Sequence, residues 1–241
     1  MRKTRSKTPP PELWDEDRLL TGCDDYKEFL KGEIESSYTQ ALRLLKPGSN
    51  ERILDIGCGR GEIVKEFAKV TEGAVGIDYS LAAVKIANNH VGTGNIVRAS
   101  ATHLPFKNRV FDGIVMLGFI NHLCEEELEM CLQESKRVLK QDGRVLITTP
   151  NSFGIALFHV FNIIYRLLFH HQRLPLRSYY HNDPLRVNSE NYLSLRKILK
   201  KCGFEPKIWF DIEVKGVAPS IVYRILFFTG PLYCIAIKGE Y

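Results

Sequence analysis

Short apolar runs alternate with helical patterns over most of the chain. Strands are predicted at five apolar runs bounded by turn residues, namely residues 52–56, 74–77, 95–99, 111–117 and 144–149. Helices are predicted between them, where apolar side chains recur every three or four positions: residues 62–70, a helix capped by Ser80, and residues 125–139. This order indicates an α/β fold with a doubly wound, mostly parallel sheet and helices on both faces.

The segments on either side of this core also follow helical patterns. Residues 14–45 predict one or two helices that cover the entrance of a site. Tyr26 or Tyr38 could contact a bound cofactor there, although packing is the more ordinary role of such residues. A further helix is predicted at residues 190–201, with Ser189 as its cap and Gly203 just beyond its end.

Residues 153–173 are the least expected part of the chain. Polar residues recur there every three or four positions and would share one face of a helix whose other faces are apolar. A membrane span needs about 20 mostly apolar residues. Because Arg166 lies in the middle of this stretch, it is not expected to cross a membrane. Three interpretations stay open: a lid over a hydrophobic substrate, a helix in a membrane interface, or a helix packed on the sheet edge. The apolar residues 221–228 could enlarge the same surface.

Length and charge favour one domain. The 241 residues, 44% of them hydrophobic, can bury one sizeable core. Four of the cations behind the net charge of +5 precede three prolines near the N-terminus, so residues 1–12 are predicted to be a disordered basic tail. Residues 13–241 would form the domain, with 152–185 as an apolar helical insertion. Because no further stripe of cations and aromatic residues occurs, no nucleic acid is expected as a partner.

The cysteines indicate a reducing compartment. The chain has six cysteines but no C-x-x-C pair, and no apolar signal segment follows its basic start. A cytoplasmic location, with membrane-peripheral contact through residues 153–173, is therefore expected. Cys58 is interpreted as a small packing residue and not as a nucleophile.

The chemistry of the chain centres on the turn after the first strand. Asp55 lies near the end of this strand, and Gly57, Gly59 and Gly61 follow at intervals of two. The dinucleotide fingerprint spaces its last two glycines three apart. An acid just before the first glycine suits an ammonium group better than a pyrophosphate. The pattern therefore disfavours an NAD-type oxidoreductase.

The run Leu54-Asp55-Ile56-Gly57-Cys58-Gly59-Arg60-Gly61 resembles the first motif of the class I S-adenosylmethionine-dependent methyltransferases, in particular the methyltransferase type 11 group. The resemblance covers residues 50–150 well and 185–241 loosely. It implies S-adenosylmethionine as the cofactor and a seven-stranded Rossmann-like sheet. The last strand, at residues 233–238, would lie antiparallel between strand five and a sixth strand at residues 207–213.

Asp78 and Tyr79 follow the second strand, beside the glycine turn. An acid at this place can accept hydrogen bonds from both hydroxyls of a ribose. The alternative is a carboxylate favoured only by the dipole of the next helix. With the ribose at Asp78, Tyr79 would flank the adenine.

The stretch after the third strand departs from the family's pattern. Ser100 stands where the family usually has an aspartate that receives the adenine amino group. A serine hydroxyl can accept the same bond more weakly, and the backbone near Ala101 or Thr102 can donate to a ring nitrogen. The carbonyl of Leu117 could take the cofactor's amino group. The departure affects the expected affinity and not the identity of the cofactor.

His122, after the fourth strand, is the candidate base, because an ordinary pKa near ~6.5 suits proton removal from a hydroxyl. A hydrogen-bonded structural role is the alternative. Quinone-biosynthesis O-methyltransferases of this fold carry two glutamates and a histidine here, associated with a divalent metal. Gly118 and Asn121 replace the glutamates in this chain, so no metal is expected. His181 loosely matches an acceptor-pocket histidine of small-molecule O-methyltransferases.

Together these features predict transfer of a methyl group to a hydroxyl, or an amine, of a small hydrophobic or lipid-linked acceptor. Alignment of the two reactants would supply much of the rate. Two alternatives stay open: a methyltransferase-like binding protein without catalysis, which Ser100 and Gly118 would permit, and the NAD-type oxidoreductase. The sequence does not predict the oligomeric state.

Overall fold

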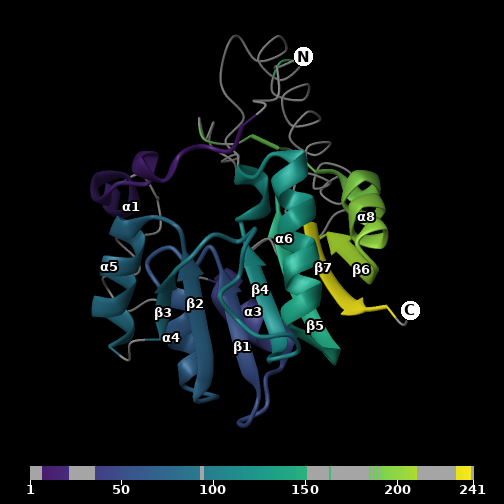
Figure 1. Ribbon diagram of the computed structural model, residues 1–241, viewed down its shortest axis with the longest axis horizontal. Coiled ribbons are helices and arrows are strands. Elements are labelled where there is room, and N and C mark those ends of the chain that lie inside the picture. The colour runs from purple at the N-terminus through teal and green to yellow at the C-terminus, as the bar shows by residue number, and fades with distance from the viewer. Residues whose placement is uncertain are drawn as a thin grey trace.

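The computed structural model describes residues 7–21, 36–92, 95–150, 163, 185, 187–188, 190–210 and 232–239. One seven-stranded sheet of order β3-β2-β1-β4-β5-β7-β6 forms its centre (Figure 1). The strands are β1 (Arg52–Ile56), β2 (Gly73–Asp78), β3 (Ile96–Arg98), β4 (Phe111–Leu117), β5 (Leu139–Thr149), β6 (Phe204–Phe210) and β7 (Leu232–Lys238). Only β7 runs antiparallel to its neighbours β5 and β6. The predicted sheet and its antiparallel last strand are therefore confirmed.

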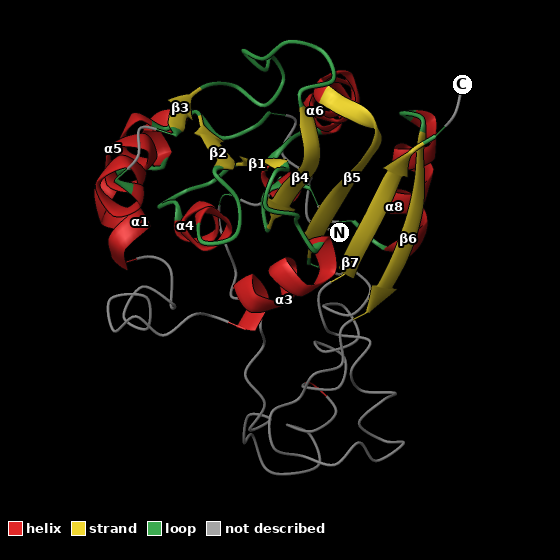
Figure 2. Ribbon diagram, turned by 90° about the horizontal axis from the view of Figure 1, so that it is seen from below, coloured by secondary structure: helices red, strands yellow, loops and turns green. Residues whose placement is uncertain are grey.

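Helices cover both faces of the sheet (Figure 2). One face packs against α3 (Ser36–Leu45), α4 (Glu62–Ala68) and α5 (Leu81–Val91). The other packs against α6 (Glu125–Val138) and α8 (Tyr192–Lys201). A short helix, α1 (Glu16–Thr21), lies beside α5, and 3-10 turns occur at Pro11–Leu13 and Ile120–His122. The apolar runs read from the sequence are buried between these layers, as a doubly covered parallel sheet requires.

Several element boundaries differ from their predicted places. The cap of α8 is Asn191, whose side chain accepts from the backbone N–H of Ser194 at 3.0 Å while the Ser194 hydroxyl accepts from the Asn191 N–H at 2.9 Å. This reciprocal pair selects Asn191 over the predicted Ser189. Residues 140–143, predicted as a turn, continue β5 past a register shift opposite β4. β6 begins at Phe204, three residues before its predicted start.

Residues 7–12 differ from the expected disordered tail. Pro9 is buried, Pro11–Leu13 forms a 3-10 turn, and the Thr8 hydroxyl accepts a hydrogen bond from the backbone N–H of Cys124 at 2.9 Å. Residues 7–21 contribute three side chains to the cavity described below. We call this segment the N-terminal strap.

Other predictions fall on residues outside the described ranges. These are Tyr26, Ser189, His181, residues 221–228 and the helix predicted at 153–173, of which Ile163 alone is described. In the part of the chain that the structure describes, no helix is long and apolar enough to cross a membrane.

Candidate functional site

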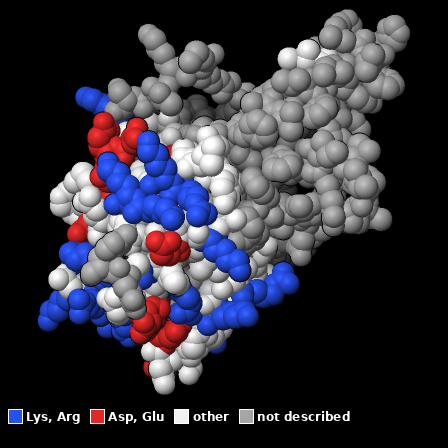
Figure 3. All heavy atoms as spheres, turned by 90° about the vertical axis from the view of Figure 1, so that its right-hand side faces the viewer, with Lys and Arg blue, Asp and Glu red and all other residues white. Residues whose placement is uncertain are grey.

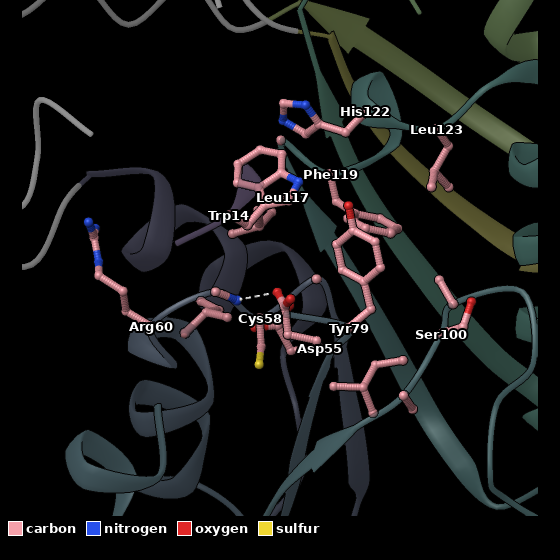
Figure 4. A pocket seen from close by; sticks show the side chains of 18 of the residues that line it. Trp14, Asp55, Cys58, Arg60, Tyr79, Ser100, Leu117, Phe119, His122 and Leu123 are labelled. Atoms are coloured by element: carbon pink, nitrogen blue, oxygen red, sulfur yellow. Dashed lines mark hydrogen bonds between the residues drawn. The ribbon is translucent and has the colours of Figure 1, made fainter. Parts of the chain in front are cut away.

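A cavity of about 300 Å³ lies at the carboxyl ends of β1, β2 and β4 (Figure 4). Open α/β sheets bind their ligands at this edge. Most of the predicted site residues line it: Asp55, Gly57, Gly59, Asp78, Tyr79, Ser100, Ala101, Thr102, Leu117 and His122. Gly61 is not among the lining residues, and His181 lies outside the described residues.

The glycine turn is shaped by two close approaches. Gly57 has a φ of +76°, and a Cβ there would lie 2.2 Å from the ring of Phe119. Gly61 has a φ of +83°, and its Cβ would lie 2.9 Å from Val91 and 3.1 Å from Ala87 on α5. Gly57 therefore lets the turn pass under the aromatic wall of the cavity, whereas Gly61 lets α5 pack against the turn.

Asp55 brings a buried and incompletely partnered carboxylate to the cavity. It is 3% exposed, and its Oδ2 has no hydrogen-bond partner. Burial, followed by the nearby carboxylates of Glu62 and Asp78, raises the pKa of Asp55 well above its ordinary value. A cation placed beside Asp55 would offset both effects, so this part of the cavity favours an ammonium group.

Asp78 is held in a fixed orientation. Its Oδ2 accepts from the backbone N–H of Gly59 at 3.0 Å, and its Oδ1 accepts from the N–H of Ser80 at 2.9 Å. Burial raises the pKa of Asp78, while these backbone hydrogen bonds oppose the rise. Each carboxylate oxygen can accept a second bond, which leaves Asp78 able to bind hydroxyl groups.

The loop after β3 is organised by its own side chains. The hydroxyls of Ser100 and Thr102 lie 2.8 Å apart, and the backbone N–H of Thr102 donates to the Ser100 hydroxyl at 3.2 Å. An adenine amino group would therefore compete with Thr102 for Ser100. Tyr79, which follows β2, also lines the cavity, and burial raises the pKa of its hydroxyl to about 12.

His122 is held by three neighbours. Its Nδ1 lies 3.3 Å from the carbonyl of Leu185, and its Nε2 lies 3.1 Å from the side-chain nitrogen of Asn121. Because a carbonyl only accepts, we assign the proton to Nδ1, which leaves the lone pair on Nε2. The rings of His122 and Trp14 meet edge to face, with centroids 4.7 Å apart.

The N-terminal strap forms part of this site; residues 14–21 were expected to cover its entrance, whereas residues 7–12 were not. The strap contributes Thr8, Trp14 and Leu19 to the lining of the cavity. The carbonyl of Trp14 accepts from the Ser80 hydroxyl at 2.7 Å, and the carbonyl of Pro9 accepts from the Tyr79 hydroxyl. The strap is therefore tied to the residues that follow β2.

Arg60 is a second missed residue. It lies in the glycine turn, is 6% exposed, and donates from Nη1 to the carbonyl of Leu19 at 2.7 Å. It also forms an ion pair with Glu62, which is buried as well. An arginine two residues before a glutamate was the available signal for the ion pair. Nothing in the sequence pointed from Arg60 to Leu19.

Cys58 is a buried cysteine in the glycine turn. Burial, then the nearby acids, raise the pKa of the Cys58 thiol well above its ordinary value, which disfavours a role as a nucleophile.

Among the described residues, no three His, Cys, Asp or Glu side chains are arranged to hold a metal ion. The absence of a metal stays a prediction.

Comparison with known proteins adds to this geometry. Residues 54–147 match the model of a family described as methyltransferase domain. A ubiquinone/menaquinone biosynthesis C-methyltransferase of Geotalea daltonii is 31% identical over 163 residues, which are 64% of this chain and 67% of that protein. An uncharacterized protein of Methanocaldococcus jannaschii is 43% identical over 104 residues, 43% of this chain but only 38% of that protein. The crystal structure of the YcgJ protein from Bacillus subtilis has the same fold, with a TM-score of 0.61 at 19% identity over 85% of this chain and 99% of that one.

Proposed function

Because the chain belongs to the class I S-adenosylmethionine-dependent methyltransferases, we propose that it transfers a methyl group to a hydroxyl, or an amine, of a small hydrophobic or lipid-linked acceptor. Membership of this family makes S-adenosylmethionine the cofactor and the protein an enzyme, and it speaks against both the NAD-type oxidoreductase and a binding protein without catalysis. The acceptor and the residues that serve it are the proposal.

The cavity fits this cofactor at several points. The unpartnered oxygen of Asp55 suits the ammonium group, and Asp78 can accept from the ribose hydroxyls. Tyr79 and the loop at Ser100 would lie on either side of the adenine, and the carbonyl of Leu117 would take the amino group as well. When bound, the cofactor supplies an electrophilic methyl group on a sulfonium.

The observation that carries the acceptor class is the wall around His122. At the end of β4 the cavity is lined by Trp14, Leu117, Phe119 and Leu123 (Figure 4). Such a wall favours an acceptor that is apolar around its reacting group. The Geotalea daltonii relative is named as an enzyme of quinone biosynthesis, which supports an apolar acceptor, although its name places the methyl group on carbon in that protein.

We assign His122 the role of base. The hydrogen bond from its Nδ1 to Leu185 would keep the lone pair on Nε2, the nitrogen that would take the proton of an acceptor hydroxyl. In the free protein Nε2 meets the side-chain nitrogen of Asn121. An acceptor hydroxyl would have to replace that contact, and Asn121 would then hold the acceptor beside the base. His181 remains a second candidate for the acceptor pocket.

A pair of histidine variants tests this assignment. His122→Gln should lower kcat/KM for the acceptor by at least about a hundredfold and leave cofactor affinity unchanged, since general base catalysis contributes factors of that size. Asp142→Asn, which alters an exposed side chain that is not among the lining residues, is the control. A loss under about tenfold, with the pH dependence of kcat/KM kept, would leave His122 a structural residue. The same measurement on His181→Gln tests whether His181 belongs to the acceptor pocket.

Peripheral membrane contact through residues 153–173 and a cytoplasmic location remain part of the proposal. The membrane contact is supported by the polar face, which carries Arg166 and Arg173, on an otherwise apolar segment, and the location by six cysteines without a C-x-x-C pair. Flotation of the protein with liposomes tests the contact. The proposal requires binding that Arg166→Glu reduces, and unchanged binding of this variant would remove the segment from the account.

A further inference from the structure

The outward face of α8 is strongly basic. Residues three and four apart on a helix share one face, and the outward residues of α8 are Leu193, Arg196, Lys197, Lys200 and Lys201. The opposite face, with Leu195 and Leu199, is fully buried against the sheet. Leu193 is 74% exposed, although it is a large apolar side chain. Four cations and a leucine therefore form one stripe.

Cations from distant parts of the chain lie beside the end of this helix. The ammonium group of Lys136, on α6, lies over Gly203, where an added Cβ would come within 2.0 Å of it. Burial, followed by the charges of Arg109 and Lys136, lowers the pKa of Lys238 at the end of β7. Lys238 is paired with Phe204, the residue after Gly203, and Arg109 and Lys136 are both close enough to repel its ammonium group. With those of the helix, these three cations form the α8 basic face: Arg109, Lys136, Arg196, Lys197, Lys200, Lys201 and Lys238.

Acidic side chains neutralise this face only in part. Lys201 lies 2.7 Å from Glu129, and Lys200 lies 3.8 Å from Glu205. Figure 3 faces this side of the molecule and shows lysine and arginine side chains gathered on it, with a few acids among them.

Helix electrostatics account for part of this pattern. Cations in the last turn of a helix are favoured by its dipole, which explains Lys200 and Lys201. The dipole does not explain cations brought beside the helix from α6 and β7. Leu193 has the largest exposed fraction among the exposed large apolar side chains of the described residues.

We propose that the α8 basic face docks the protein on a membrane surface rich in anionic phospholipid, with Leu193 entering the headgroup layer. Clustered lysines and arginines are attracted to the negative potential of such a surface. The exposed side chain of Leu193 could be buried in a lipid layer. A free anion in solution could not bury it. RNA is the competing polyanion; among the described residues, Tyr192 is an aromatic side chain that contacts the face, through Arg196, and a single ring is a poor platform for successive bases. This docking does not depend on which acceptor the enzyme methylates.

Sedimentation of the full chain with lipid vesicles tests the proposal. We expect binding to vesicles with about a third phosphatidylserine, little binding to pure phosphatidylcholine, and weakening by salt. The double variant Lys197→Glu/Lys200→Glu should lower the partition coefficient at least about tenfold. The control Lys65→Glu/Lys85→Glu makes the same change in net charge on exposed lysines of α4 and α5 and should bind as the wild type does. Leu193→Ser should weaken binding without changing its salt dependence.

Three outcomes would overturn the proposal. Equal losses in the two double variants would mean that net charge alone governs binding. Loss in Arg166→Glu, with none in Lys197→Glu/Lys200→Glu, would move the contact to residues 153–173. A gel shift with RNA that Lys197→Glu/Lys200→Glu abolishes, without vesicle binding by the wild type, would make the face an RNA site. Calorimetry with S-adenosylmethionine on each variant checks the cofactor site separately.

Discussion

Asp55 is a buried carboxylate whose charge has no full compensation in the free protein. Its burial and the neighbouring acids raise the pKa of the carboxyl in the folded state above the value in the unfolded chain. Such a group contributes stability below its unfolded pKa, and that contribution is lost as the pH rises through the folded pKa. At neutral pH, Asp55 therefore lowers the stability of the cofactor-free protein, and a bound cation would restore it.

Asp55→Asn should separate stability from binding. At neutral pH we expect the variant to melt several degrees above the wild type without cofactor, because a buried charge is removed at nearly constant shape. We also expect S-adenosylmethionine to bind at least about tenfold more weakly, because a charged hydrogen bond is lost. Thermal melts and calorimetry measure the two effects.

The control for this pair of measurements is Asp142→Asn on an exposed acid, which should change neither quantity. Unaltered cofactor affinity in Asp55→Asn would contradict the role given to Asp55. A melting temperature of Asp55→Asn below that of the wild type, without cofactor, would show that the buried charge of Asp55 does not destabilise the protein.

Sequence reasoning at the residue scale worked where a motif is local. Asp55 and two of the three glycines line the cavity because the strand, the turn and the ligand edge are consecutive in the chain. Ser100 shows the limit of such reasoning. Its position was predictable, but its hydrogen bonds with Thr102 depend on how the loop folds on itself.

Among the elements, the N-terminal strap was predicted only in its second half, residues 14–21, and not in residues 7–12. β4 has its predicted bounds, since a continuous apolar run of strand length is a local signal. The strap is fixed by contacts that span 41 residues between Leu19 and Arg60 and 116 residues between Thr8 and Cys124. No periodicity encodes such pairs, so a stretch with a basic start and three prolines looked like a tail.

Tyr79→Phe should loosen the strap while keeping the ring beside the cofactor. The change removes only the hydroxyl that donates to the carbonyl of Pro9. Losing one such bond should speed local opening about fivefold. Trypsin cleavage after Arg18 reports this opening, and added S-adenosylmethionine should slow cleavage in both proteins.

A matched tyrosine on α8 provides the control for the strap. Tyr192→Phe removes a hydroxyl that accepts from Arg196 at 3.3 Å, far along the chain from the strap, and should leave cleavage after Arg18 unchanged. Equal cleavage of Tyr79→Phe and the wild type would show that the strap does not depend on Tyr79.

In the molecule as a whole, the parallel strands bring the residues of the site together. Other parts of the chain together form the α8 basic face. The carboxyl ends of β1, β2 and β4 meet at one edge, which is why Asp55, Asp78 and Leu117 could be grouped before their positions were known. The α8 basic face could not be foreseen. Its cations come from positions 109 to 238, and the sequence alone suggested a nearly neutral body.

The central claim is that this methyltransferase acts on a hydrophobic acceptor. The most direct measurement is incubation of the full chain and methyl-labelled S-adenosylmethionine with a cell extract, which is then separated into organic-soluble, aqueous, protein and RNA fractions. We expect label to enter the organic-soluble fraction and Asp55→Asn to reduce it greatly. Label confined to RNA, to protein or to aqueous small molecules would show that the acceptor is not hydrophobic.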